Sequence, residues 1–160
     1  MSTFFANVPM WVYPLFVLLV ILGLRASKDR TVPIILVLAL PLLGILTLRN
    51  IVSLSPAAWV WLVAAAAYAL GIGFGMVWQR GWILLKAKGS IQVKGEWITM
   101  LAMMVIFCAG FANGALSALL PEVSQSSMFA ACFAVVTCVP AGQFLGRAIT
   151  TLRAPLSSPA

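Results

Sequence analysis

Side chains able to carry out chemistry are scarce in this chain. It has no histidine, and its three cysteines, Cys108, Cys132 and Cys138, form no Cys-x-x-Cys pair. Cys132 and Cys138 are six residues apart, so on a helix they point in different directions. Cys108 and Cys138 both fall near the middle of an apolar run and meet only if their helix faces agree. Thiol, haem or zinc chemistry therefore has little support, and we expect the cysteines to act as small apolar side chains.

The acidic residues are Asp29, Glu96 and Glu122, and each falls in a link between apolar runs. We expect Asp29 and Glu96 to favour the starts of the helices that follow them, because a carboxylate is stabilised at a helix N-terminus. An ion-coupled carrier normally needs a carboxylate inside the membrane, which argues against a coupled pump here. With no nucleophile–base pair and no set of metal ligands, the sequence predicts no enzyme, no cofactor and no metal.

Five apolar runs fill most of the 160 residues and must position these few polar groups. The chain is 63% hydrophobic and 8% charged, whereas about a quarter of the residues in a soluble protein are charged. Each run approaches the length of about 20 residues that a helix needs to cross a bilayer. The sequence therefore predicts an all-α membrane protein, a bundle of five transmembrane helices forming one domain over residues 1–153 with a disordered tail at 154–160. The predicted spans are residues 4–24, 31–48, 56–78, 97–120 and 126–148.

The basic residues orient this bundle. Nine of the ten lie in alternate links or at and beyond the end of the last run, and Arg49 alone lies on the other side. Because cytoplasmic loops are rich in lysine and arginine, we expect the N-terminus outside and the C-terminus inside. Residues 1–7 carry no charged side chain, so the first run is expected to be a retained helix and not a signal peptide. The same topology, together with anionic lipid headgroups, accounts for the net charge of +7, and we expect no nucleic-acid partner.

The link between the third and fourth runs predicts a short cytoplasmic β-hairpin. Ile83 and Leu85 alternate with Leu84 and Lys86, and Ile91 and Val93 alternate with Gln92 and Lys94. Gly89-Ser90 between these two segments suits a two-residue turn. An isolated hairpin is marginal in water, so it must lean on the bundle, the headgroups or a partner. Its cations either only fix the topology or dock a protein or anionic lipid; they are Arg80, Lys86, Lys88 and Lys94.

Glycines four residues apart indicate close helix contacts. Such pairs form a flat stripe that lets another backbone approach, and they occur in the third, fourth and fifth runs. The third and fifth runs cross in the same direction, so their pairs lie at similar depths. The contacts are either within one chain or between copies in a homo-oligomer. The pairs are Gly71/Gly75, Gly110/Gly114 and Gly142/Gly146.

Four polar residues within the runs are candidates for function. Asn113, in the outer half of the fourth run, needs hydrogen-bond partners, supplied either by another helix or by a bound or translocated polar solute. Tyr68, Thr137 and Gln143 are weaker candidates for the same two roles, because threonine bonds to its own backbone and a buried tyrosine is usually packed.

Two segments carry a resemblance. Residues 24–30 (LRASKDR) and the basic link that runs through residues 94–97 (KGEW) resemble an uncharacterised family of small bacterial inner-membrane proteins. The resemblance covers most of the chain and implies a multi-pass protein of the bacterial inner membrane. The family has no assigned activity, so it implies no functional residues.

We therefore expect a small scaffold or accessory subunit that acts through its helix contacts and its basic hairpin, with the bilayer, anionic headgroups and a larger membrane protein as partners. The alternative is an oligomeric passive channel or facilitator for a small solute, lined by Asn113 and the spans that contain Pro41 and Pro140.

Overall fold

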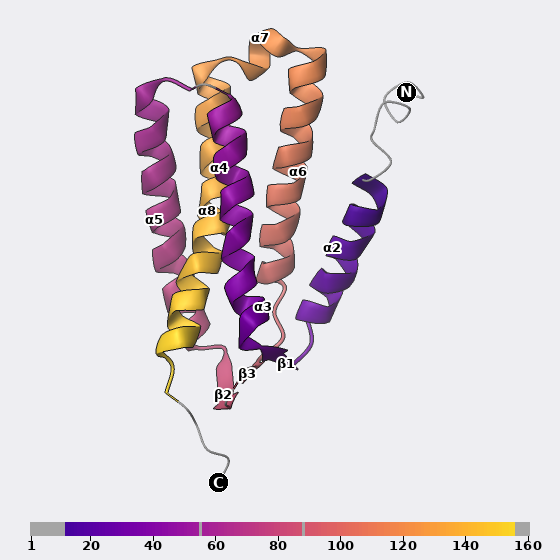
Figure 1. Ribbon diagram of the computed structural model, residues 1–160, viewed down its shortest axis with the longest axis vertical. Coiled ribbons are helices and arrows are strands. Elements are labelled where there is room, and N and C mark those ends of the chain that lie inside the picture. The colour runs from indigo at the N-terminus through magenta and orange to yellow at the C-terminus, as the bar shows by residue number, and fades with distance from the viewer. Residues whose placement is uncertain (1–11, 55, 88, 156–160) are drawn as a thin grey trace.

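The computed structural model describes residues 12–54, 56–87 and 89–155, and these are mostly helical. Figure 1 shows long helices side by side with a small sheet at one end of the bundle. We call that end the sheet end and the opposite one, which carries α7, the loop end. The helices are α2 (Val12–Ala26), α3 (Ile34–Ala39), the 3-10 turn η1 (Leu40–Leu42), α4 (Leu43–Ser53), α5 (Ala58–Arg80), α6 (Ile98–Leu119), α7 (Pro121–Ser124) and α8 (Ser127–Arg153).

Four of the described helical segments are long and apolar enough to cross a membrane. The first joins α3, η1 and α4 over Ile34–Ser53, and the others are α5, α6 and α8. The η1 turn falls at Pro41, which has no backbone N–H to donate within a regular helix. The described part of α2 is shorter, and residues 4–11 of the first predicted span lie outside the described residues. Helices α4 and α8 continue past the predicted ends of the second and fifth spans, to Ser53 and Arg153.

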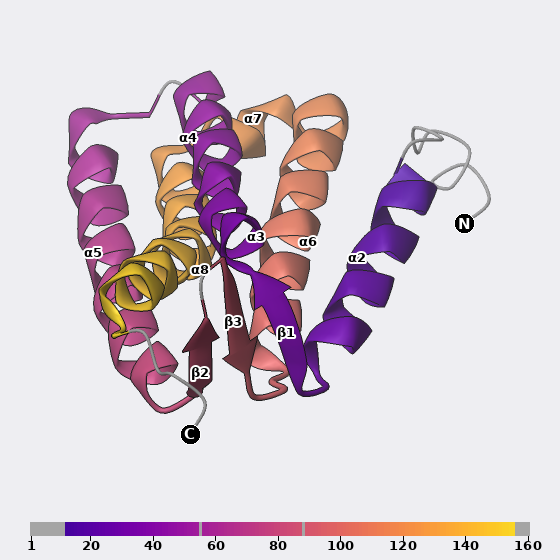
Figure 2. The same cartoon turned by 60° about the horizontal axis from the view of Figure 1, so that its bottom comes forward.

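Helix α8 is the centre of the bundle. It packs against α5 along its length and also contacts α3, η1, α4 and α6, whereas α2 lies at the periphery beside α6 (Figures 1 and 2). The buried residues of α8 include many small ones, which lets the other helices approach closely. Large apolar side chains on α2, α4, α5 and α6 are exposed, as expected for surfaces that face lipid tails.

The α5–α8 contact is a backbone-to-backbone approach made by glycines. A Cβ on Gly71 or Gly75 would collide with the carbonyl of Val139 or Gln143, respectively. A Cβ on Gly142 or Gly146 would likewise collide with a carbonyl of α5. Because only glycine leaves room for such an approach, these four positions fix how α5 and α8 pack.

The sheet has three antiparallel strands in the order β1-β3-β2. They are β1 (Arg30–Pro33), β2 (Ile83–Ala87) and β3 (Ser90–Val93). Ser90 pairs with Ala87, so it belongs to β3 and not to the turn, and Gly89 precedes it with a φ of 90° that favours glycine. Figure 2 shows the three strands beneath the helices.

The first strand corrects the predicted start of the second span. Residues 31–33 were expected to be helical, but they pair with β3 in the register Thr31↔Gln92 and Val32↔Ile91. The pairing agrees with the local preferences of these residues, since Thr31 and Val32 are β-branched and Pro33 disfavours the α conformation in the residue before it. The helix therefore begins only at Ile34.

The sheet is fastened to the helices on several sides. Val32, Ile91 and Val93 form a buried cluster with Val37 of α3. The amide of Glu96 donates to the carbonyl of Ala26 at 2.9 Å. A third strand and these attachments supply the stability that a two-stranded hairpin lacks in water.

Candidate functional site: a buried polar cluster at the sheet end

A cluster of polar side chains is buried where α5, α6 and α8 meet at the sheet end. We call it the polar cluster; its members are Trp78, Gln79, Glu96, Thr99 and Arg147. Helix α5 contributes Trp78 and Gln79 in its last turn, and α8 contributes Arg147. Glu96 lies in the link from β3 to α6, and Thr99 lies in the first turn of α6. Three helices and the sheet therefore position one site.

Arg147 is the hub of this cluster. Its Nη2 forms an ion pair with Glu96 Oε1, its Nη1 donates to Thr99 Oγ1 at 2.5 Å, and its Nε donates to Gln79 Oε1 at 2.8 Å. Both charged residues are less than a tenth exposed, Glu96 at 6% and Arg147 at 7%. Because each guanidinium nitrogen meets an acceptor from a different segment, the arginine ties α5, α6 and the β3–α6 link to α8.

The carboxylate of Glu96 is equally well supplied with donors. Besides Arg147, Oε1 accepts a hydrogen bond from Thr99 Oγ1 at 2.7 Å, and Oε2 accepts one from Trp78 Nε1 at 2.7 Å. The indole of Trp78 stacks on Trp82 with ring centroids 5.6 Å apart. A buried ion pair is tolerated only when its remaining hydrogen-bonding groups are satisfied, and here they are. The cluster therefore closes the sheet end with a net neutral set of hydrogen-bonded groups.

The positions of Glu96 and Arg147 differ from those expected. The sequence placed Glu96 in a link as a helix-capping residue and Arg147 among the cations that follow the last span, but the structure buries both and pairs them. One signal was available: Arg147 directly follows Gly146 and lies four residues after Gln143, on the face of α8 that meets α5.

Among the predicted docking lysines, Lys86 is buried. Its Nζ donates to the carbonyls of Leu152 at 2.9 Å and Ala154 at 2.7 Å, at the C-terminal end of α8. Unbonded carbonyls at a helix C-terminus attract a cation, which explains this position. Lys86 therefore holds α8 on the sheet and is not available at an exposed docking surface. Arg80 and Lys94 are exposed, Lys94 over the Trp82 ring, and Lys88 lies outside the described residues.

The glycine pairs fall into two groups. Gly71, Gly75, Gly142 and Gly146 meet in the α5–α8 contact within one chain. Around Gly114 there is open space, and the nearest atom to a Cβ on Gly110 would be Asn50 Nδ2 at 3.9 Å. The Gly110/Gly114 pair is therefore not a close helix contact within the described chain.

The structure does not bring the four polar candidates together. Tyr68 and Gln143 lie at the α5–α8 contact, and Gln143 is buried with its Nε2 unpartnered among the described residues. Thr137 donates to the carbonyl of Phe133 at 2.7 Å, one turn earlier in its own helix. Asn113 is buried on α6, and its Oδ1 has no partner in the described part of the chain.

The three cysteines differ in how far they are buried. Cys138 is buried in the core with Ala134 and Val60, whereas Cys108 and Cys132 are exposed, and all three are free thiols. No group of three or more potential metal ligands occurs among the residues that the structure describes.

The described helices place this chain in the class of helical membrane proteins, since four of them are long and apolar enough to cross a bilayer. No protein-family model, curated protein or solved structure matches the chain.

Proposed function

We propose that the chain is a small accessory subunit of the bacterial inner membrane that binds a larger membrane protein through an exposed basic surface at its sheet end. In this proposal it has five spans, with the N-terminus outside and the sheet end in the cytoplasm. We call the surface the basic platform; it consists of Arg25, Lys28, Arg80, Lys94 and Arg153, all exposed. This placement agrees with the positive-inside rule.

The observation that carries the proposal is that ordered elements of the sheet end carry these cations. Arg25 and Lys28 lie at the end of α2 and just beyond it, and Arg80 and Arg153 lie at the ends of α5 and α8. Lys94 directly follows β3. The backbone amide of the next residue, Gly95, donates a hydrogen bond to Asp29 Oδ1 at 2.7 Å. Asp29 is the exposed acid at this end among the described residues. The cations therefore project from ordered segments of the backbone with little opposing charge, which suits an acidic partner surface.

Apolar side chains beside the cations support a protein partner over lipid headgroups alone. Trp97, just before α6, is 60% exposed, and Leu84, within β2, is 48% exposed. Exposed tryptophan and arginine are enriched where protein interfaces gain most of their energy. In this proposal the glycines of α5 and α8 serve the chain's own packing, and we expect no enzymatic activity.

The first test is native mass spectrometry of the protein gently extracted from its own membrane. We expect a stoichiometric complex with a larger protein. Combining Arg80→Gln, Lys94→Gln and Arg153→Gln should reduce the retained partner by about tenfold or more, because these changes remove the charge complementarity of the interface. Arg49→Gln is the matched control, since Arg49 is exposed on α4 away from the platform. A species that carries only lipid, unchanged by the triple substitution, would contradict the proposal.

A second candidate function rests on Asn113. Its buried, unpartnered Oδ1 is the feature that favours a passive facilitator for a small polar solute, assembled as an oligomer because α8 fills the centre of a single chain. Solute uptake by proteoliposomes separates the two candidates. A facilitator would lose most of its flux on Asn113→Leu and keep it on Thr137→Val, because the Thr137 hydroxyl is satisfied by its own helix. An accessory subunit would show no flux above that of protein-free liposomes.

A further inference from the structure

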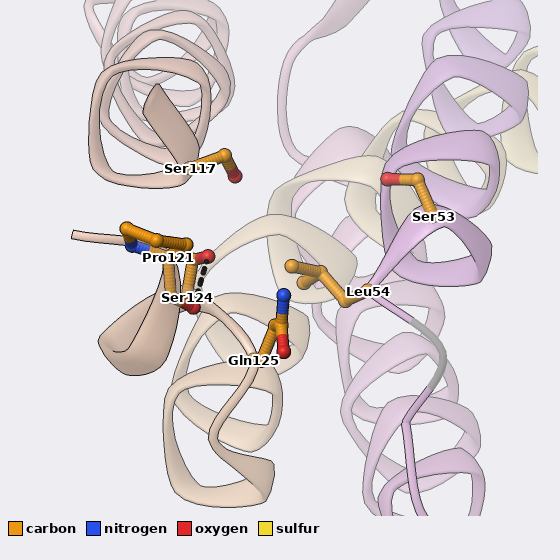
Figure 3. A pocket seen from close by; sticks show the side chains of 6 residues that line it. All are labelled: Ser53, Leu54, Ser117, Pro121, Ser124 and Gln125. Atoms are coloured by element: carbon orange, nitrogen blue, oxygen red, sulfur yellow. Dashed lines mark hydrogen bonds between the residues drawn. The ribbon is translucent and has the colours of Figure 1, made fainter. Parts of the chain in front are cut away.

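A pocket of about 500 Å³ lies at the loop end, far from the polar cluster. Its walls come from the end of α4 and the residue after it, the last turn of α6, α7 and the link to α8. It has a size typical of sites for small molecules. The residues that line it are Ser53, Leu54, Ser117, Pro121, Ser124 and Gln125 (Figure 3).

The polar groups of this pocket converge on one space. Figure 3 shows the hydroxyls of Ser53 and Ser117 facing each other from α4 and α6, with the amide of Gln125 directed between them. Ser53 Oγ donates to the carbonyl of Asn50 at 2.7 Å, and Ser124 Oγ donates to that of Pro121 at 3.0 Å. Each of these two hydroxyls therefore keeps its lone pairs to accept a hydrogen bond, while Ser117 and Gln125 can both donate and accept.

Further polar side chains lie beneath the pocket. Asn113 is one turn below Ser117 on α6, so the two share a face. That face meets α4, because Gly110, on the same side of α6, lies near Asn50 Nδ2. Asn113 does not line the pocket, but its Oδ1 is buried without a partner among the described residues, on the face of α6 that carries Ser117.

The lining sets the chemistry of the ligand. None of the six lining residues carries a charge, so the pocket offers neither a counterion for an anion nor one for a cation. Together, the serine hydroxyls and the Gln125 carboxamide can both donate to and accept from the hydroxyl groups of a ligand. Leu54 and Pro121 provide apolar contacts for the C–H groups of the same ligand. We propose that this pocket binds a small uncharged polyol, either a free monosaccharide or the glycosyl headgroup of a neutral lipid. This inference is independent of the proposed function, which concerns the opposite end of the molecule.

The test is saturation-transfer difference NMR on the full chain in nanodiscs. One arm adds free glucose; the other places a monoglucosyl diacylglycerol in the disc and follows the sugar protons. Transfer in the first arm supports a free polyol, transfer only in the second supports a lipid headgroup, and either one supports the site.

Two variants show whether the signal comes from this pocket. Ser117→Val combined with Gln125→Leu should weaken sugar binding roughly tenfold, the effect of losing a neutral hydrogen bond or two. Both side chains are exposed, so the fold should tolerate the changes. Ser127→Val is the matched control, an exposed serine at the same end that does not line the pocket. Unchanged transfer in the double variant, or no transfer to either sugar in the wild type, would overturn the proposal, as would preferential binding of glycerol 3-phosphate over glucose.

Discussion

Replacing Arg147 with methionine is expected to lower the free energy of unfolding by about 3 kcal/mol or more, because it leaves the Glu96 carboxylate buried without its counterion. Methionine keeps much of the length of the arginine stem and removes only the charged head. The loss would also free Gln79 Oε1 from its bond to Arg147 Nε and so loosen α5 from α8 at the sheet end. Reversible unfolding in mixed micelles with increasing SDS measures the change.

The companion substitution shows whether the effect comes from the unpaired charge. Adding Glu96→Gln to Arg147→Met removes both charges, while a glutamine still offers an oxygen to Trp78 Nε1 and Thr99 Oγ1. The double variant should therefore regain a large part of the lost stability, because removing both partners of a buried pair costs much less than removing one. Arg49→Met, an exposed arginine on α4, should change the unfolding free energy by no more than about 0.5 kcal/mol. Equal losses in the single and double variants would mean that the ion pair contributes nothing beyond the packing of its side chains.

The coarse architecture was readable from the sequence because it follows from local patterns. Runs of apolar residues predicted the helices that the structure places in the bundle, and four of those helical segments have membrane length. The spacing of Gly71, Gly75, Gly142 and Gly146 gives each helix a flat stripe, and the structure puts these stripes against each other. Both patterns repeat within one helix, so they need no knowledge of which segments meet.

The polar cluster was not readable because it joins residues far apart in the chain. Arg147 is 51 residues from Glu96 and 68 from Gln79, and no local pattern marks them as partners. The positive-inside rule treats every arginine near the end of a span as an exposed cytoplasmic charge, and it therefore assigns Arg147 to the surface. Lys86 was misplaced for the same reason, since its partners are carbonyls at the end of α8. Strand β1 was missed because Thr31 and Val32 continue an apolar run into α3, and the pairing with β3 overrides that pattern.

The sheet end and the loop end differ in how their polar groups are used. In the polar cluster, Arg147 and Glu96 are bonded to each other and to their neighbours, so the cluster ties the helices together and its two charged groups already have partners. At the loop end, the Asn113 oxygen has no partner in the described chain, and serines face an open pocket. Unsatisfied hydrogen-bonding capacity beside open space is the condition for binding a polar molecule. Gln143 Nε2 and Thr151 Oγ1 on α8 are also unpartnered among the described residues, so it is the open pocket that leads us to place ligand binding at the loop end.

Alanine at two neighbouring glycines of α5 is expected to change stability in opposite directions. Gly73→Ala adds a methyl group where no atom lies within 4 Å, so it should stabilise the protein by up to about 1 kcal/mol through the higher helix propensity of alanine. Gly75→Ala places the same methyl group against the carbonyl of Gln143 and must push α5 and α8 apart, at a cost of about 2–3 kcal/mol.

The two substitutions are chemically identical and lie two residues apart in one helix, so each is the control for the other. Unfolding in the same SDS titration should move the two midpoints to opposite sides of the wild type. Gly142→Ala should behave like Gly75→Ala, because its methyl group meets the carbonyl of Tyr68 on the facing helix. Because α8 contacts α3, η1, α4, α5 and α6, a shift of α8 at this contact must disturb the packing of the whole bundle. Equal responses at positions 73 and 75 would mean that α5 and α8 are not packed through these glycines.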